Sequence, residues 1–105
     1  MTKKTLPRWY QSLKKQFPDY MESLESLGHS LRRAGPLTEK TSQLIQLAAA
    51  AAIRSEGAVH SHVRRSLDAG ITKDEIYHTL ILLTSTIGFP NVSAALSWAN
   101  DIIEK

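Results

Sequence analysis

The 105-residue sequence contains no cysteine. This absence excludes disulfide bonds, thiolate nucleophiles and thiolate metal ligands. The sequence also has no run of about 18 apolar residues, so it predicts no transmembrane helix. Residues 1–7 are polar and basic without an apolar centre, so no signal peptide is predicted either. We therefore expect a cytoplasmic protein that is not inserted in a membrane.

Glycine and proline are scarce, with five and four residues, and most stand between apolar stretches of helical spacing. No stretch alternates apolar and polar residues as a half-buried strand does. The length suits one domain, 1–105, in which we separate N-terminal helices (1–35) from a helical core (36–104). The sequence predicts an all-α fold of about six helices, at 5–17, 18–35, 38–53, 57–69, 72–87 and 91–103. Gly57 is expected to interrupt the chain before the fourth helix, and Gly70 to end that helix in a left-handed conformation.

The clearest helix start is the sequence Thr-Lys-Asp-Glu at residues 72–75, which has the spacing of a capping box. Thr72 is predicted as the N-cap, and the side chain of Glu75 is predicted to return to the backbone of Thr72. Ile71 and Ile76 flank the box as a hydrophobic staple.

The third and fifth predicted helices are apolar on nearly all sides, which is typical of buried helices. A lone domain of this length leaves much of its apolar surface uncovered. We therefore expect the chain to form a homo-oligomer through an apolar interface.

The net charge of +3 is unevenly distributed. Residues 1–40 carry eight Lys or Arg and four Asp or Glu, whereas the rest of the chain carries five and six. The basic residues are scattered and are not interleaved with aromatic side chains that would stack on bases. We interpret them as a solvated helix face, and we expect neither nucleic acid nor a membrane as a partner.

The residues best suited to chemistry lie in one short segment around the start of the fourth predicted helix. At about 100° per residue, Ser55, Ala58 and His62 fall within about 60° of one another. Glu56 and His60 are four residues apart and share a different face. His60 and His62 point about 160° apart, so one regular helix does not offer both to a single metal ion.

Several short motifs follow one another at characteristic distances over about residues 36–100. They are Thr38-x-x-Thr41-x-Gln43-Leu44-Ile45, Ser55-Glu56-Gly57-Ala58, His62-Val63-Arg64, Leu67-x-Ala69-Gly70-Ile71-Thr72, Glu75-Ile76 and Gly88-Phe89-Pro90. Together they resemble the carboxymuconolactone decarboxylase-like family, which includes the alkylhydroperoxidase D-like proteins. The resemblance implies an all-helical fold that forms homo-oligomers, often trimers or hexamers, with sites near the subunit contacts.

Redox members of that family carry Cys-x-x-Cys-x-x-x-His at a helix start, and a Glu about one helix earlier completes a proton relay. The resemblance places Ser55 and Ala58 at the cysteine positions, His62 at the histidine and Gln43 at the glutamate. Serine offers no accessible thiolate, alanine has no functional group, and glutamine does not carry a proton as a carboxylate does. We therefore expect no thiol peroxidase activity.

The decarboxylase branch of the family needs no cysteine and uses acid–base groups on a small cyclic lactone acid. The resemblance thus implies lyase-type chemistry on a small organic acid, with His62, Glu56, His60 and Ser55 as the catalytic candidates. An ordinary imidazole has a pKa of ~6.5 and is suited to proton transfer near neutral pH. We expect His62 to lie near the start of its helix, as a neutral base facing an anion-binding pocket. No cofactor and no metal ion are expected.

Other interpretations stay open. In one, the chain is a non-catalytic oligomeric binding or scaffold protein, and His62 is a packing residue. Glu56 and His60 are also compatible with an exposed ion pair or, together with a histidine of another subunit, with a metal site. His78, which lies opposite the apolar stripe of its helix, is interpreted as a residue of the oligomer contact.

Overall fold

The computed structural model describes residues 6–105, which form α-helices joined by short turns. Within this range the all-α prediction is confirmed. Thr5, the predicted start of the first helix, lies outside the described residues. The chain divides into two compact units, Met1–Pro36 and Leu37–Lys105.

The first unit is a pair of helices, α1 (Arg8–Gln16) and α2 (Pro18–Arg32), which pack against each other. The hydroxyl of Tyr10 on α1 donates a hydrogen bond of 2.7 Å to Glu25 on α2. The ammonium group of Lys14 lies 3.3 Å from the same carboxylate. Polar contacts to one carboxylate therefore join the two helices.

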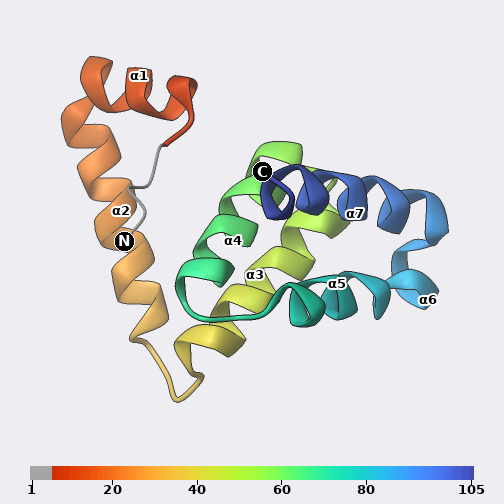
Figure 1. The fold of residues 1–105 in the computed structure, drawn as a ribbon. Coiled ribbons are helices and arrows are strands. Elements are labelled where there is room, and N and C mark those ends of the chain that lie inside the picture. Colours follow the sequence, from red (N-terminus) through yellow and green to blue (C-terminus); the bar gives the residue numbers. More distant parts are fainter. Residues whose placement is uncertain (1–5) are drawn as a thin grey trace. The chain divides into compact units, whose positions relative to one another are not determined.

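The second unit contains the helices that carry the predicted site. Residues 37–105, all of them described, form α3 (Glu39–Ala52), α4 (Glu56–Asp68), α5 (Lys73–Ile81), α6 (Thr84–Ile87) and α7 (Phe89–Ile103). Helix α4 packs against both α3 and α7, and α5 also packs against these two helices (Figure 1). Helix α6 is a single turn that leads into α7.

The core of this unit lies between α3, α4, α5 and α7 and combines branched side chains with alanines. Alanine lets neighbouring helix backbones approach closely because it adds little volume to the contact. Val59 and Val63, one turn apart on α4, are fully buried in this core. The other buried core residues are Leu47, Ala50, Ala51, Ile71, Ile76, Leu80, Ala95 and Ala99. Buried contacts therefore fix α4 relative to its neighbours.

Helices α3 and α4 end in the same way but with different residues. Gly70 follows α4 with φ +86°, as predicted, and Arg54 follows α3 with φ +59°. In both turns the amide of the left-handed residue and the next amide donate hydrogen bonds of 2.9–3.1 Å to carbonyls of the last helical turn. The side chain of Arg54 hydrogen-bonds to Asn91 of α7. The prediction that Gly57 interrupts the chain is wrong, because Gly57 lies in the first turn of α4 and Arg54 makes the turn.

The start of α5 is the predicted capping box. The Oγ1 atom of Thr72 accepts a hydrogen bond of 3.1 Å from the backbone amide of Glu75. The backbone amide of Thr72 donates in return to the Glu75 carboxylate over 2.9 Å. The hydrogen bonds from the backbone and side chain of Thr72 lower the pKa of Glu75, because they favour its ionised form. Ile71 and Ile76, the predicted staple, are both buried in the core.

The fifth predicted helix does not continue unbroken to Ile87. Beyond Ile81 the chain tightens, and the amide of Leu83 donates to the carbonyl of Leu80, three residues earlier, over 3.1 Å. The hydroxyl of Thr84 donates to the carbonyl of Ile81 over 2.7 Å. This side-chain bond satisfies a carbonyl at the helix end, and the helix restarts as α6. If α6 is counted as the last turn of α5, residues 6–105 contain the six helices predicted.

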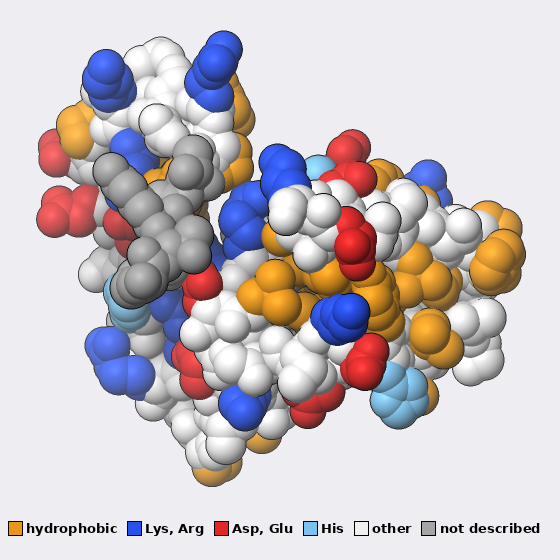
Figure 2. Space-filling view, viewed as in Figure 1, with side chains coloured by type: hydrophobic (Ala, Val, Ile, Leu, Met, Phe, Trp, Pro, Cys, Tyr) orange, Lys and Arg blue, Asp and Glu red, His pale blue; other side chains and the backbone are white. Residues whose placement is uncertain are grey.

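Helices α3 and α5 are not covered on all sides by this chain alone, as expected for apolar helices in a single chain of this length. Ile45 in α3 is 50% exposed and Ile81 in α5 is 51% exposed. Ile53 after α3, Leu82 after α5 and Phe89 at the start of α7 are each more than 60% exposed. Figure 2 shows apolar side chains gathered on one face of this unit. None of the helices in residues 6–105, however, is both long and apolar enough to cross a membrane.

Candidate functional site

Ser55, one of the four predicted site residues, immediately precedes helix α4. Ser55 is the N-cap, and its hydroxyl oxygen accepts a hydrogen bond of 3.2 Å from the backbone amide of Ala58. Serine is favoured there because its oxygen satisfies an amide that has no partner within the helix. The Ser55 hydroxyl therefore starts the helix, and Glu56 places its carboxylate in the first turn.

His62 lies in the middle of α4 and faces α3. Its Nδ1 atom is 3.1 Å from Oε1 of Gln43, and Nε2 of Gln43 donates a hydrogen bond of 3.0 Å to Oε2 of Glu39. The side chain of Gln43 is buried, with 1% of the residue exposed, whereas His62 is half-buried and Glu39 is exposed. This Glu39–Gln43–His62 chain leads from the imidazole to the protein surface.

The Glu39–Gln43–His62 chain determines which imidazole nitrogen carries the proton. A carboxylate only accepts hydrogen bonds, so the amide NH₂ of Gln43 must face Glu39. The carbonyl oxygen of Gln43 then faces His62, and because it is also only an acceptor, Nδ1 must be the donor. In the neutral imidazole, the lone pair therefore lies on Nε2.

The position of His62 differs from the expectation that it lies near the start of its helix. Helix α4 runs from Glu56 to Asp68, so His62 is about two turns inside it. The field of a helix end falls off within the first turn. The first turn of α4 is already occupied by its own Ser55 cap and by the Glu56 carboxylate. The expectation that His62 lies near the start of its helix is therefore wrong.

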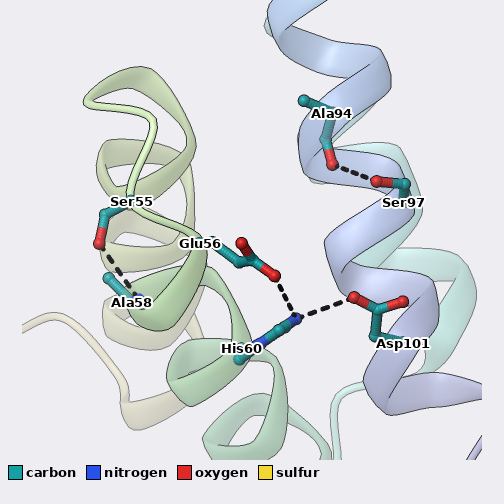
Figure 3. A network of polar contacts seen from close by, with 7 residues as sticks. All are labelled: Ser55, Glu56, Ala58, His60, Ala94, Ser97 and Asp101. Carbon is teal, nitrogen blue, oxygen red and sulfur yellow. Dashed lines mark hydrogen bonds and ion pairs between the residues drawn. The ribbon is translucent and has the colours of Figure 1, made fainter.

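On another side of α4, Glu56 and His60 face Asp101 of α7 (Figure 3). Nε2 of His60 lies 3.1 Å from Oδ2 of Asp101 and 4.0 Å from Oε2 of Glu56. The side chain of His60 is 23% exposed, and both carboxylates are more than half exposed. These three residues, the Glu56–His60–Asp101 cluster, have ligand atoms that all lie within 4.8 Å of one another.

The four predicted site residues therefore do not form one site. His62 pairs with α3, Glu56 and His60 face α7, and Ser55 caps the helix. The divergence of the two histidines follows from their spacing, as predicted. His78 is exposed on α5.

The sequence analysis did not identify Glu39 and Asp101 as site residues. Glu39 carried a usable signal, because it precedes Gln43 by four residues and so shares its helix face. Asp101 carried none, because it is 41 residues from His60 and only the packing of α4 against α7 brings them together.

Two arginines follow His62 on α4 and differ in their surroundings. Partial burial lowers the pKa of Arg64, and the adjacent positive charge of Arg65 lowers it further. The negative charge of Asp68 acts in the opposite direction. Arg65 is exposed and lies three residues after His62, which makes the two side chains neighbours on the helix surface. Of the two arginines, Arg65 is therefore the one whose helical position is closer to that of His62.

The protein is all-helical over residues 6–105. Ser55, Ala58 and His62 follow one another at the spacing of the Cys-x-x-Cys-x-x-x-His motif, without its cysteines. The sequence profile of the Carboxymuconolactone decarboxylase family matches residues 18–101. The chain belongs to the carboxymuconolactone decarboxylase family, as the resemblance predicted.

A solved structure leads to the same family. The crystal structure of a carboxymuconolactone decarboxylase family protein from Legionella pneumophila, in its apo form, is similar with a TM-score of 0.76 and 25% sequence identity. The similarity covers 91% of this chain and 86% of that one. No curated protein matches the sequence.

Proposed function

We propose that the chain is a cofactor-independent acid–base enzyme in which His62 moves a proton to or from a small organic acid, such as a lactone acid. The observation that carries this proposal is the Glu39–Gln43–His62 chain. Because this chain holds the proton on Nδ1, Nε2 is the atom that accepts a proton from the substrate.

Because Gln43 is an amide, it does not relay protons as a carboxylate at the same position would. An amide orients the imidazole but does not take up its proton. A proton that reaches His62 is therefore not passed on to Gln43. This suits a reaction in which one group acts first as the base and then as the acid, as in moving a proton between two carbon positions.

Arg65 is the residue that we assign to the carboxylate of the substrate. It lies one turn after His62, on the neighbouring part of the helix surface, and its guanidinium matches the geometry of a carboxylate. A variant Arg65→Gln is expected to raise KM for an acid substrate more than it lowers kcat, because it removes binding and leaves the proton acceptor.

Thiol chemistry is not part of the proposed function. Ser55 and Ala58 occupy the positions of the two cysteines, and the Ser55 hydroxyl caps the helix. We expect no turnover of hydrogen peroxide above buffer with any thiol donor, measured by consumption of peroxide. Turnover by metal-free wild-type protein would contradict this expectation.

The experiment that tests the proposal is solvent deuterium exchange at carbon, followed by NMR. The purified protein is incubated in D₂O with a panel of small lactone acids and related carboxylic acids. We expect at least one acid to incorporate deuterium next to its carbonyl group. His62→Gln is expected to slow this exchange by about 10²–10⁴-fold, the usual contribution of a general base.

His60→Gln is the matched control, because it removes an imidazole two residues away on the same helix. It is expected to leave the exchange rate within about twofold of wild type. Equal losses in His60→Gln and His62→Gln, or no exchange with any acid, would refute the acid–base function.

A second candidate function is that of a non-catalytic oligomeric binding protein, and the exposed apolar residues favour it. Ile53, Leu82 and Phe89 are each more than 60% exposed in the single chain. We propose that a second copy of the chain covers such residues in a homo-oligomer. Sedimentation at micromolar concentration is expected to show an oligomer, and a stable monomer would contradict this part of the proposal.

A further inference from the structure

The Glu56–His60–Asp101 cluster has no role in the proposed chemistry of His62, and its atoms are arranged as metal ligands. We propose that it binds one divalent transition-metal ion, with zinc as the best match. This departs from the sequence analysis, which expected no metal ion, and from its alternative of a third ligand from another subunit. Asp101 of the same chain takes that place.

The distances fit a small ion bound by nitrogen and oxygen. Zinc lies about 2.0–2.1 Å from such ligands, so two ligands of a tetrahedral site are separated by about 3.4 Å. The two distances from His60 Nε2 to the carboxylate oxygens, 3.1 and 4.0 Å, lie on either side of this value. The third separation is at most 4.8 Å, and a small rotation of the flexible Glu56 side chain would shorten it.

Hydrogen bonding of His60 alone does not account for both carboxylates. Its Nε2 atom carries a single hydrogen or a single lone pair, and its 3.1 Å contact with Asp101 uses that position. The Glu56 oxygen, at 4.0 Å, is beyond hydrogen-bonding distance. Both carboxylates nevertheless point to the same nitrogen (Figure 3). A cation among the three atoms would bind all of them at once and offset the repulsion between the two carboxylates.

The backbone holds the three ligands in place. Glu56 and His60 are one turn apart on α4, so their spacing is set by the helix. Asp101 comes from α7, which packs against α4. Val59, next to His60, and Ala99, two residues before Asp101, are both buried in the common core. The ligand-bearing helices are therefore fixed relative to each other before any ion binds.

The chemistry of the donors selects the class of ion. Imidazole nitrogen favours zinc and similar transition metals, whereas calcium and magnesium prefer a shell made of oxygen atoms alone. The exposed side of the cluster leaves room for water as the fourth ligand. Three protein ligands with an open fourth position are the usual set of a zinc ion that binds water or a small molecule.

The test is calorimetric titration of the metal-free full-length protein with zinc chloride. We expect saturable binding of one zinc ion per chain and a rise in Tm when zinc is present. His60→Gln is expected to abolish this binding. Glu56→Gln and Asp101→Asn should each weaken it by about tenfold or more, since even the loss of a group that only supports a ligand costs about 10–100-fold.

Two variants of histidines outside the Glu56–His60–Asp101 cluster test whether zinc binds at another histidine of the protein. His78→Gln removes an exposed imidazole on α5, and His62→Gln removes the imidazole of the proposed acid–base site; neither is expected to change zinc affinity. The circular dichroism of each variant confirms that it is folded. Absence of saturable binding, half a zinc ion per chain, or an equal loss in His78→Gln would overturn the proposed site. Because His62→Gln separates the two sites, failure of zinc binding leaves the acid–base function to be judged by its own assay.

Discussion

His60 and His62 are two residues apart on the same helix but have contrasting surroundings. His60 lies beside two exposed carboxylates, one from its own helix and one from α7. His62 contacts a buried amide of α3, which in turn binds an exposed carboxylate. The spacing along α4 turns the two rings to different sides, and the helix on each side supplies a different partner, Asp101 of α7 for His60 and Gln43 of α3 for His62.

The amide between His62 and Glu39 is the main difference between the two sides. Around His60 two carboxylate oxygens lie 3.1 and 4.0 Å from Nε2, so a metal ion among them would have three ligand atoms within reach. Around His62 the contact with α3 is an amide, which orients the ring and itself carries no charge. The side of His60 therefore offers three possible metal ligands, whereas the side of His62 offers one imidazole oriented by an amide.

The largest expected difference in stability comes from removing the partner of each histidine. Gln43→Leu leaves the Nδ1–H group of His62 without its buried acceptor, which is expected to cost about 1–3 kcal/mol in the free energy of unfolding. Asp101→Ala removes an exposed ion pair and is expected to cost less than about 1 kcal/mol. Urea denaturation at neutral pH, without metal, measures both. Equal losses of unfolding free energy in the two variants would mean that the hydrogen bond from His62 to Gln43 stabilises the fold no more than the exposed ion pair of His60 does.

A change at the start of α4 should lower the stability of the whole helix, which carries both His60 and His62. Ser55→Ala removes the N-cap and is expected to lower the free energy of unfolding by about 1 kcal/mol. Thr72→Ala is the matched variant at the start of α5 and is expected to cost about the same. Neither variant should alter the zinc affinity. A midpoint unchanged within error in Thr72→Ala would mean that its capping bonds do not stabilise α5.

The smallest expected effect is one of pH, at α5, which lies outside both histidine sides. The hydrogen bonds from Thr72 lower the pKa of Glu75, so the ionised carboxylate stabilises the folded state. This contribution is present above the ordinary pKa of 4.5 and is lost as the pH falls through the lowered value. Glu75→Gln keeps a capping side chain but loses the charge. The stability difference between wild type and this variant is therefore expected to shrink below pH 4.5, measured by urea denaturation at several pH values.

The sequence predicted best the features that depend on neighbouring residues. The capping box of Thr72 and Glu75, the left-handed Gly70 and the divergence of His60 and His62 all follow from local rules of helix geometry. The turn after α3 did not, because the left-handed residue is Arg54, where local rules favour glycine. Its hydrogen bond to Asn91 of α7 is a tertiary contact that no local rule contains.

The partners of the two histidines show the same limit. The sequence identified Gln43 and His62 by their positions in a family motif, but not that they share a hydrogen bond. Asp101 joins His60 only through the packing of α4 against α7. The sequence predicted that a single chain leaves apolar surface uncovered, but not that Ile53 and Leu82 belong to it, because helix periodicity does not show which apolar residues the same chain covers.

The tautomer of His62 is the most direct test of the account, because the proposed base exists only if the proton lies on Nδ1. Two-bond ¹H–¹⁵N correlation spectra of the imidazole groups distinguish the two nitrogens. We expect the neutral ring of His62 to show a protonated Nδ1 and an unprotonated Nε2 in wild type, and a loss of this preference in Gln43→Leu. A neutral His62 with its proton on Nε2 in wild-type protein would contradict the Glu39–Gln43–His62 chain and the function proposed from it.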